Sequence, residues 1–226
     1  MACTEHDRAA GSAVRSDLGT ATLHTLSVGP MDNNTYLLIC RATGLSLLVD
    51  AAAEPDRLLA LLDKETGGSL DLVVTTHRHA DHRGALTQVL ATTGARHACG
   101  GADAEAIGVP TDRLLAHGDV VEVGALRLEI IALRGHTPGS VALAWREPQG
   151  ADGDPGRVHL FTGDSLFPGG PGRTAGPAEF ASLMADLEAR VFGVLDDATL
   201  VHPGHGAGTT LGVERPALPA WRARGW

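Results

Sequence analysis

Cysteine is scarce in this sequence: its 226 residues include Cys3, Cys40 and Cys99, and no two of them form a CxxC pair. An odd count without paired spacing indicates neither a disulfide framework nor a thiolate zinc site, and reduced thiols are typical of a cytoplasmic protein. No apolar run approaches the ~20 residues that a membrane-spanning helix needs. Residues 1–17 lack the apolar segment of a signal peptide. We therefore expect a cytoplasmic protein that does not associate with membranes.

Positive charge is also limited, because 18 lysines and arginines face 27 aspartates and glutamates, a formal net charge of −9 at pH 7. A nucleic-acid-binding protein needs a basic face, so we expect no nucleic-acid partner. Hydrophobic (43%) and charged (20%) residues occur as in a globular domain. The length fits one large domain or two small ones. We predict a flexible leader at residues 1–18 and a single domain at 19–226; the oligomeric state stays open.

The pattern of apolar runs predicts strands separated by helices and turns. Strands are expected at 35–40, 45–49, 70–75, 95–99, 120–123, 126–133, 141–145, 158–162 and 199–201. Helices are expected at 55–66, 84–93 and 177–192, whereas 101–118 is predicted to be irregular or partly helical and 148–156 rich in turns. The strands come in paired groups without strict strand–helix alternation. This pattern favours an α/β fold in which sheets pack together with helices outside.

Histidine is unusually frequent, with 11 residues, and four metal-capable side chains fall within six positions: His77, His79, Asp81 and His82. The preceding predicted strand ends at Thr75, so this segment lies at the edge of a sheet, where sites are commonly built. His77 and His79 can reach the same side of an extended segment. Asp81 and His82 follow as the chain turns into a helix. One loop could therefore hold two adjacent metal ions.

Three further fragments each place a metal-capable side chain beside glycine, directly after a predicted strand. They are GHTPG with His136, TGDS with Asp164, and HPGHG with His205. Glycine allows backbones to approach a shared centre, and imidazole and carboxylate ligands suit zinc and iron. Together with the HxHxDH segment, the fragments predict one shared metal site.

The motifs HxHxDH, GHTPGS, TGDSLF and PGHG resemble those of the metallo-β-lactamase-fold hydrolases, and most closely the hydroxyacylglutathione hydrolase (glyoxalase II) family. The likeness covers residues 20–216, including TTLGVER at 209–215. It implies an αββα sandwich with two divalent metal ions at one edge, zinc first, with iron or manganese as alternatives. Carried over by motif, the ligands are His77, His79 and His136 for the first metal and Asp81, His82 and His205 for the second, with Asp164 bridging both.

The resemblance also implies the chemistry, which is hydrolysis of an acyl thioester by a hydroxide that bridges the two metals. Asp81 and Asp164 are then the catalytic carboxylates. No serine or cysteine nucleophile is needed, and Ser140 and Ser165 are interpreted as turn residues. The family usually carries a C-terminal helical domain that contacts glutathione, but only 21 residues follow His205.

Arg173 matches a basic position of the family that contacts the thiol carrier, so we predict that it binds substrate. Ala175 stands where the family often has tyrosine, which leaves the identity of the carrier open. The alternatives are a lactone or ester hydrolase of the same fold, a mononuclear iron persulfide dioxygenase, and a scaffold whose metals are structural. A β-lactamase is disfavoured because it usually has cysteine or serine at the position of Asp164.

The remaining histidines are interpreted as ordinary surface or core residues: His6, His24, His97, His117 and His159. His202 lies three residues before His205 and is expected to support that loop. The C-terminal segment with Trp221, Arg222 and Arg224 is basic and aromatic. From the sequence, it can pack on the body, cover the pocket or fray.

Overall fold

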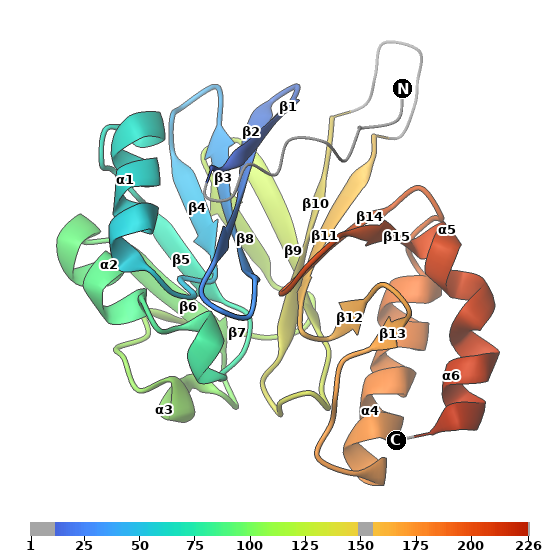
Figure 1. Ribbon diagram of the computed structural model, residues 1–226. Helices are drawn as coiled ribbons and strands as arrows, with labels where there is room; N and C mark the ends of the chain where they lie inside the picture. Colours follow the sequence, from blue (N-terminus) through green and yellow to red (C-terminus); the bar gives the residue numbers. More distant parts are fainter. Residues whose placement is uncertain (1–11, 149–155, 226) are drawn as a thin grey trace.

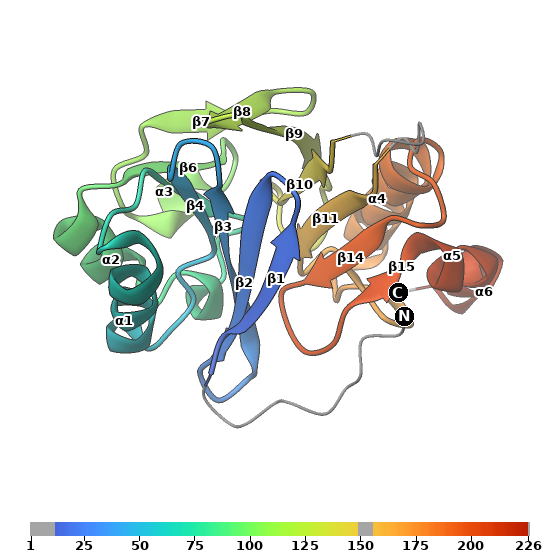
Figure 2. The same ribbon diagram turned by 90° about the horizontal axis from the view of Figure 1, so that it is seen from above.

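The computed structural model describes residues 12–148 and 156–225, and in these ranges two β-sheets stack face to face with helices outside (Figures 1 and 2). The first sheet has seven strands in the order β1-β2-β3-β4-β5-β6-β7, and the second has six in the order β15-β14-β11-β10-β9-β8. Figure 2 shows α1, α2 and α3 on the outer face of the first sheet and α4, α5 and α6 outside the second. The predicted αββα sandwich is therefore confirmed.

The elements have the following bounds. The first sheet contains β1 (Val14–Leu18), β2 (Ala21–Val28), β3 (Asn33–Cys40), β4 (Ser46–Val49), β5 (Leu72–Thr75), β6 (Arg96–Gly100) and β7 (Arg113–Leu115). The second contains β8 (Val120–Val123), β9 (Leu126–Ala132), β10 (Val141–Arg146), β11 (Val158–Gly163), β14 (Leu200–Pro203) and β15 (Thr209–Thr210), and β12 (Leu166–Phe167) pairs with β13 (Gly170–Pro171) as a short hairpin. The helices are α1 (Pro55–Thr66), α2 (Leu86–Thr93), α3 (Ala104–Ile107), α4 (Pro177–Leu187), α5 (Leu211–Glu214) and α6 (Leu218–Arg224), with short turns η1 (Ala80–His82), η2 (Glu188–Phe192) and η3 (Arg215–Ala217).

The core has three layers because both faces of each sheet are covered. Strand β5 illustrates this, since all four of its residues are buried. Leu72 and Val74 belong to the cluster between the sheets, whereas Val73 packs with α1 and α2 on the other face. Alternate side chains of a strand point to opposite faces, so a strand covered on both sides reads as a continuous apolar run. A third cluster joins the second sheet to α4 and α6.

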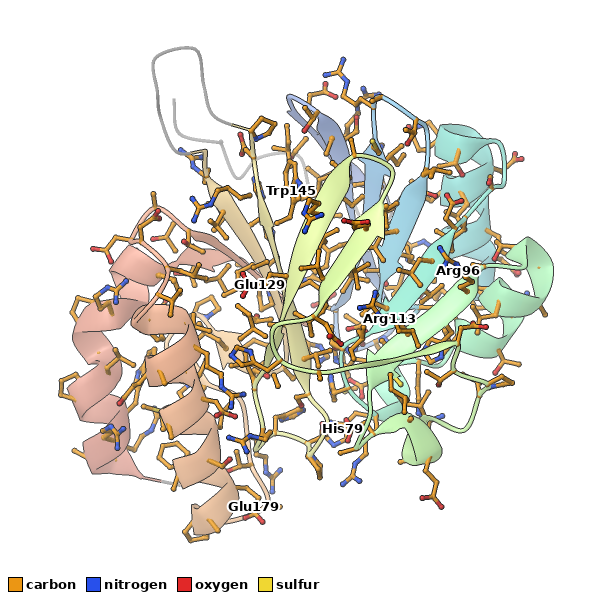
Figure 3. The ribbon with its side chains drawn as sticks, turned by 180° about the vertical axis from the view of Figure 1, so that it is seen from behind. His79, Arg96, Arg113, Glu129, Trp145 and Glu179 are labelled. Carbon is orange, nitrogen blue, oxygen red and sulfur yellow. The ribbon has the colours of Figure 1, made fainter. Side chains whose placement is uncertain are left out.

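Strand direction gathers the site loops at one end of the sandwich. Strands β4, β5, β6 and β7 run parallel to one another, and β11 runs parallel to β14. The carboxyl ends of β5, β11 and β14 therefore open onto loops that carry the predicted ligands. Figure 3 shows His79 at the end of the sandwich opposite Trp145.

The structure corrects several expectations from the sequence. The predicted leader at 1–18 is wrong for Val14–Leu18, which pairs with β2 as an edge strand; residues 1–11 lie outside the described ranges. The segment 101–118, predicted to be irregular or partly helical, contains α3 and also β7. The helix predicted at 177–192 is α-helical to Leu187 and continues as a π-helical turn. Residues 149–155 of the predicted turn-rich segment lie outside the described ranges.

Among residues 12–148 and 156–225, no helix is long and apolar enough to cross a membrane.

Candidate metal centre

All seven predicted ligands converge on one centre, although they come from four separate segments. His77 and His79 lie on the loop after β5, and Asp81 and His82 lie in η1 directly behind them. The others are His136 between β9 and β10, Asp164 just after β11, and His205 after β14. Their ligand atoms fall into overlapping groups in which all atoms lie within 4.8 Å of one another.

The first group consists of His77, His79 and His136. The Nε2 atoms of His77 and His136 are 3.3 Å apart. The exposed ring of His79 meets both of the other rings edge-on, with centroids 4.8 Å and 4.6 Å away. The three imidazoles therefore surround one small volume at the surface end of the site.

The second group consists of Asp81, His82 and His205, and it is deeper on one side because His82 is fully buried. The Nε2 atoms of His82 and His205 are 3.2 Å apart, and Asp81 Oδ2 lies 3.3 Å from His205 Nε2. Asp164 stands between the groups: its Oδ1 is 3.2 Å from His82 Nε2, and its Oδ2 is 3.4 Å from His205 Nε2 and 3.6 Å from His136 Nε2.

The outer ring nitrogens of three of these histidines are held by carbonyl or carboxylate oxygens. Nδ1 of His136 faces the Arg173 carbonyl at 2.6 Å, Nδ1 of His205 faces the Met31 carbonyl at 2.8 Å, and Nδ1 of His82 faces Asp50 Oδ2 at 2.8 Å. Because carbonyl and carboxylate oxygens only accept, each Nδ1 donates, and Nε2 is the atom directed to the centre. Such contacts fix the tautomer and orientation of metal-binding histidines.

Asp50 connects both groups, and the sequence analysis missed it. Its buried carboxylate accepts from the Thr76 backbone N–H and hydroxyl and from His82. Because the Thr76 hydroxyl donates to Asp50, it accepts from His77 Nδ1 at 3.0 Å. Asp50 directly follows β4 and has φ 58°, in the left-handed region that aspartate tolerates. Its place after an apolar strand is the same signal that identified Asp164.

Asn33 is a second residue that the sequence analysis missed. Its side chain is 1% exposed and donates from Nδ2 to Asp81 Oδ2 at 3.0 Å. Its backbone forms an isolated bridge with His205. Burial acts to raise the pKa of Asp81, but the bond from Asn33 and the nearby His82 outweigh it, so that this pKa lies below its ordinary value. Asn33 therefore keeps Asp81 ionised and fixes its direction.

The charges of the centre suit a cation. Burial acts to raise the pKa of Asp164, but contacts with His205 and His82 lower it far below its ordinary value. Burial acts to lower the pKa of His82, yet the carboxylates of Asp50 and Asp164 raise it to about 10, so they favour a positive charge at this place, which a proton supplies until a metal ion displaces it. Burial lowers the pKa of His77, which favours the neutral imidazole that a metal ion requires.

The donor set also fits divalent metal ions by geometry. Asp164 Oδ1 is buried and has no hydrogen bond from any described residue, although His82 Nε2 lies 3.2 Å away. Two ligand atoms about 2.0–2.1 Å from one tetrahedral ion lie roughly 3.3 Å apart, and the ligand contacts here span 3.2–3.7 Å. Lone pairs of carboxylates and neutral imidazoles that face each other at such distances repel unless a cation, either a proton or a metal ion, lies between them. Nitrogen and oxygen donors without thiolates fit zinc, iron or manganese.

Arg173 lies beside this centre but is not part of it. Its backbone carbonyl orients His136, while its exposed side chain lines a neighbouring cavity of about 340 Å³. Phe180 and Arg224 line the same cavity. The C-terminal segment therefore packs on the body as α6, with Trp221 buried beside Phe192.

The other histidines lie outside the centre, as the sequence analysis expected. His24, His97 and His159 are buried, and His117 is exposed; His6 lies outside the described ranges. His202 stacks on His159 and Phe161, and its Nε2 faces His159 Nδ1 at 3.0 Å. The thiols of Cys40 and Cys99 are free and buried.

Comparison with known proteins places these features in a family. The chain is 36% identical over 176 residues to the hydroxyacylglutathione hydrolase of Fuscovulum blasticum, an alignment that covers 77% of this chain and 62% of that protein. Hydroxyacylglutathione hydrolase GloC of Haemophilus influenzae is 29% identical over 193 residues, covering 76% of this chain and 85% of that protein. The chain thus spans less than two thirds of the length of the first relative and most of the second.

A solved structure described as TTHA1623 in a di-iron-bound form superposes with a TM-score of 0.70 and 31% identity, covering 87% of this chain and 99% of that one. The family model described as the metallo-beta-lactamase superfamily matches residues 28–205, a range that includes all seven predicted ligands. Two stacked sheets carry the loops of the predicted ligands at one edge, and the family model covers most of the chain. The chain therefore belongs to the metallo-beta-lactamase superfamily.

Proposed function

We propose that this protein is a metal-dependent hydrolase with a dinuclear centre that cleaves an acyl thioester, in the manner of the hydroxyacylglutathione hydrolases it resembles. The observation that carries the proposal is the place of Asp164 between the two groups, because its Oδ1 faces His82 while its Oδ2 lies within 3.6 Å of both His205 and His136. A carboxylate shared in this way suits two ions about 3.5–4 Å apart, the spacing of two-metal hydrolytic sites.

The chain's own residues would orient the reaction. Two bound divalent ions would supply a water of lowered pKa and polarise the acyl carbonyl. Asp81 and Asp164 stay ionised as acceptors, and Asn33 fixes Asp81. Ser140 is engaged with the Thr137 backbone N–H and hydroxyl. Attack by water, without a covalent intermediate on Ser140, is therefore the route that these contacts favour.

The cavity beside His136 is the proposed site for the leaving thiol carrier. It is lined by residues 171–174, which include Arg173, and by Phe180, Arg224 and Gly225. Among residues 12–148 and 156–225, neither arginine has a carboxylate within 4.0 Å, whereas Arg222 on the same helix pairs with Glu188. Two guanidinium groups without an acidic partner favour an anionic carrier, whose carboxylates they would bind through paired hydrogen bonds.

A substrate panel on metal-quantified protein tests the proposed function. It should contain S-lactoylglutathione, a neutral acyl thioester, a lactone, a β-lactam and a persulfide. We expect nearly two metal ions per chain and the highest kcat/KM for an anionic thioester. Faster hydrolysis of the lactone would favour the lactonase alternative, and one iron per chain with persulfide oxidation would favour the dioxygenase.

A further inference from the structure

Asp103 is a fully buried carboxylate that lies outside the ligand set, between β6 and α3. It occupies the N-cap position of α3, where an aspartate usually accepts a hydrogen bond from its own helix. Its side chain makes no such bond. A buried carboxylate needs compensating partners, and Asp103 finds them on two other loops.

Those loops are the ones that carry the first histidine group. Asp103 Oδ2 accepts from the Arg78 backbone N–H at 3.0 Å and from the Thr137 hydroxyl at 2.5 Å, and Oδ1 accepts from the Gly139 backbone N–H at 2.9 Å. Arg78 lies between His77 and His79, and Thr137 directly follows His136. One carboxylate thus ties together the segments that bear all three first-group histidines.

The packing around Asp103 leaves little freedom to this arrangement. A Cβ at Gly139 would lie 2.5 Å from the Asp103 backbone nitrogen, and a Cβ at Gly100 would lie 1.9 Å from the Gly139 carbonyl oxygen. Real Cβ atoms do not approach that closely, so glycine at both positions lets the loop lie directly against the end of β6. The carboxylate and this close contact act on the same segment.

The second group has anchors of its own. Asp50 holds His82, Asn33 holds Asp81, and the Met31 carbonyl holds His205. By contrast, the ring of His79 makes no hydrogen bond to another described residue, so its place depends on the backbone that Asp103 fixes. We propose that Asp103 is a positioning residue that sets the affinity of the first metal position independently of the second.

The inference rests on the proposed metal centre but not on its substrate, so the test measures metal binding. Asp103→Asn replaces one acceptor oxygen with a donor that faces backbone N–H groups. We expect the first position to bind Zn²⁺ about 10–100-fold more weakly, as is typical when a partner of a metal-binding residue is lost. Chelator competition should then find close to one tightly bound Zn²⁺ where the unmodified protein holds two.

Double variants assign the loss to one position. Asp103→Asn combined with His205→Ala should hold almost no Zn²⁺ tightly, because both positions are then damaged. Asp103→Asn combined with His136→Ala should match His136→Ala alone, because both changes act on the first position. Equal weakening of both positions, or no weakening of either, would overturn the proposal. If the unmodified protein itself binds fewer than two ions, the proposed dinuclear function fails instead.

Asp186→Asn is the matched control, because Asp186 is also a buried carboxylate that accepts the backbone N–H and guanidinium of Arg134, close to His136. It does not contact the loop of His77 and His79. We expect metal-free Asp186→Asn to melt at a lower temperature than the metal-free unmodified protein but to retain two ions when metal is supplied. Loss of the first-position ion in this variant would mean that any destabilisation of the fold weakens that position, and it would overturn the proposal. If Asp103→Asn does not fold, Thr137→Val decides, because it removes the hydroxyl that donates to Asp103 and that also contacts Ser140, and this loss should weaken the first position about 2–10-fold.

Discussion

At the residue scale, Asp164 is the predicted ligand whose carboxylate lies between the two groups, because its Oδ2 is within 3.6 Å of His136 in the first group and of His205 in the second, and its Oδ1 faces His82. Asp164→Ala removes both contacts, and Asp164→Asn keeps the shape but removes the charge that keeps two cations close together. We expect both variants to lose metal and thioesterase activity together, the asparagine variant nearly as severely. Elemental analysis and kcat/KM on the same preparation are the measurements. An asparagine variant with unchanged turnover and metal content would refute the bridging role.

Arg173 and Arg224 provide a second prediction at this scale. If they bind the anionic end of the substrate equally in the ground and transition states, their loss raises KM and leaves kcat nearly unchanged. A charged hydrogen bond contributes about 1.5–3 kcal/mol, so Arg173→Ala should lower kcat/KM for an anionic thioester about 10–100-fold, and Arg224→Ala should act in the same direction.

Arg222→Ala is the control for those two variants. Arg222 lies on α6, as Arg224 does, but its guanidinium pairs with Glu188. It should leave KM unchanged. A neutral acyl thioester should be hydrolysed equally by all three variants. If Arg173→Ala behaves like Arg222→Ala on the anionic substrate, Arg173 is only a solvated loop residue.

At the scale of elements, the strands that could be predicted are those buried by their own apolar residues. The interior strands β3, β5, β9 and β11 were expected close to their observed positions. The edge strands β1 and β7 were not, because their side chains are mostly exposed and a neighbour's hydrogen bonds define them. Strand β2 was missed because buried polar residues such as Thr22 and His24 interrupt its apolar pattern.

The predicted metal ligands and the residues that orient them also differ in how much the local sequence reveals. The predicted ligands stand in dense local motifs, so the sequence alone groups together the side chains that the structure brings within 4.8 Å of one another in overlapping groups. Asp50 acts on Thr76, which is 26 positions away, and Asn33 lies near His205 across 172 positions. Asp50 is marked locally only by its place after an apolar strand, and Asn33 by nothing local, because the partners of both residues are set only when the sheets bring distant segments together.

The sequence left open whether the C-terminal segment packs on the body, and the structure shows that it does so as helix α6. Trp221 is 3% exposed and packs beside Phe192 and the rest of the outer cluster of the second sheet. Trp221→Ala should lower the free energy of unfolding by about 3–5 kcal/mol, because truncation leaves a cavity. Urea unfolding measures this, with Val213→Ala as control, since Val213 is 69% exposed. Equal stability of the two variants would mean that α6 does not support the fold.

At the scale of the whole molecule, buried neutral histidines link stability to pH. Burial lowers the pKa of His97 and His159, and burial together with the facing His159 lowers the pKa of His202 to about 3. Below about pH 6.5, the unfolded chain binds protons at these histidines that the folded chain does not bind. The free energy of unfolding therefore falls as the pH falls, by up to ~1.4 kcal/mol per pH unit for each such histidine.

His202→Gln isolates this effect, because the raised pKa values of His82 and His205 act in the opposite direction and are common to both proteins. Between about pH 6 and pH 4.5, the unmodified protein should lose up to ~1.4 kcal/mol more per pH unit than the variant. The free energy of unfolding continues to fall because of His202 until the pH reaches the pKa of this residue in the folded protein, about 3. Urea unfolding at several pH values measures both slopes, and His117→Gln, at an exposed position, should leave the slope unchanged. If the free energy of unfolding of His202→Gln changes with pH at the same slope as that of the unmodified protein, the fold does not hold the His202 imidazole neutral.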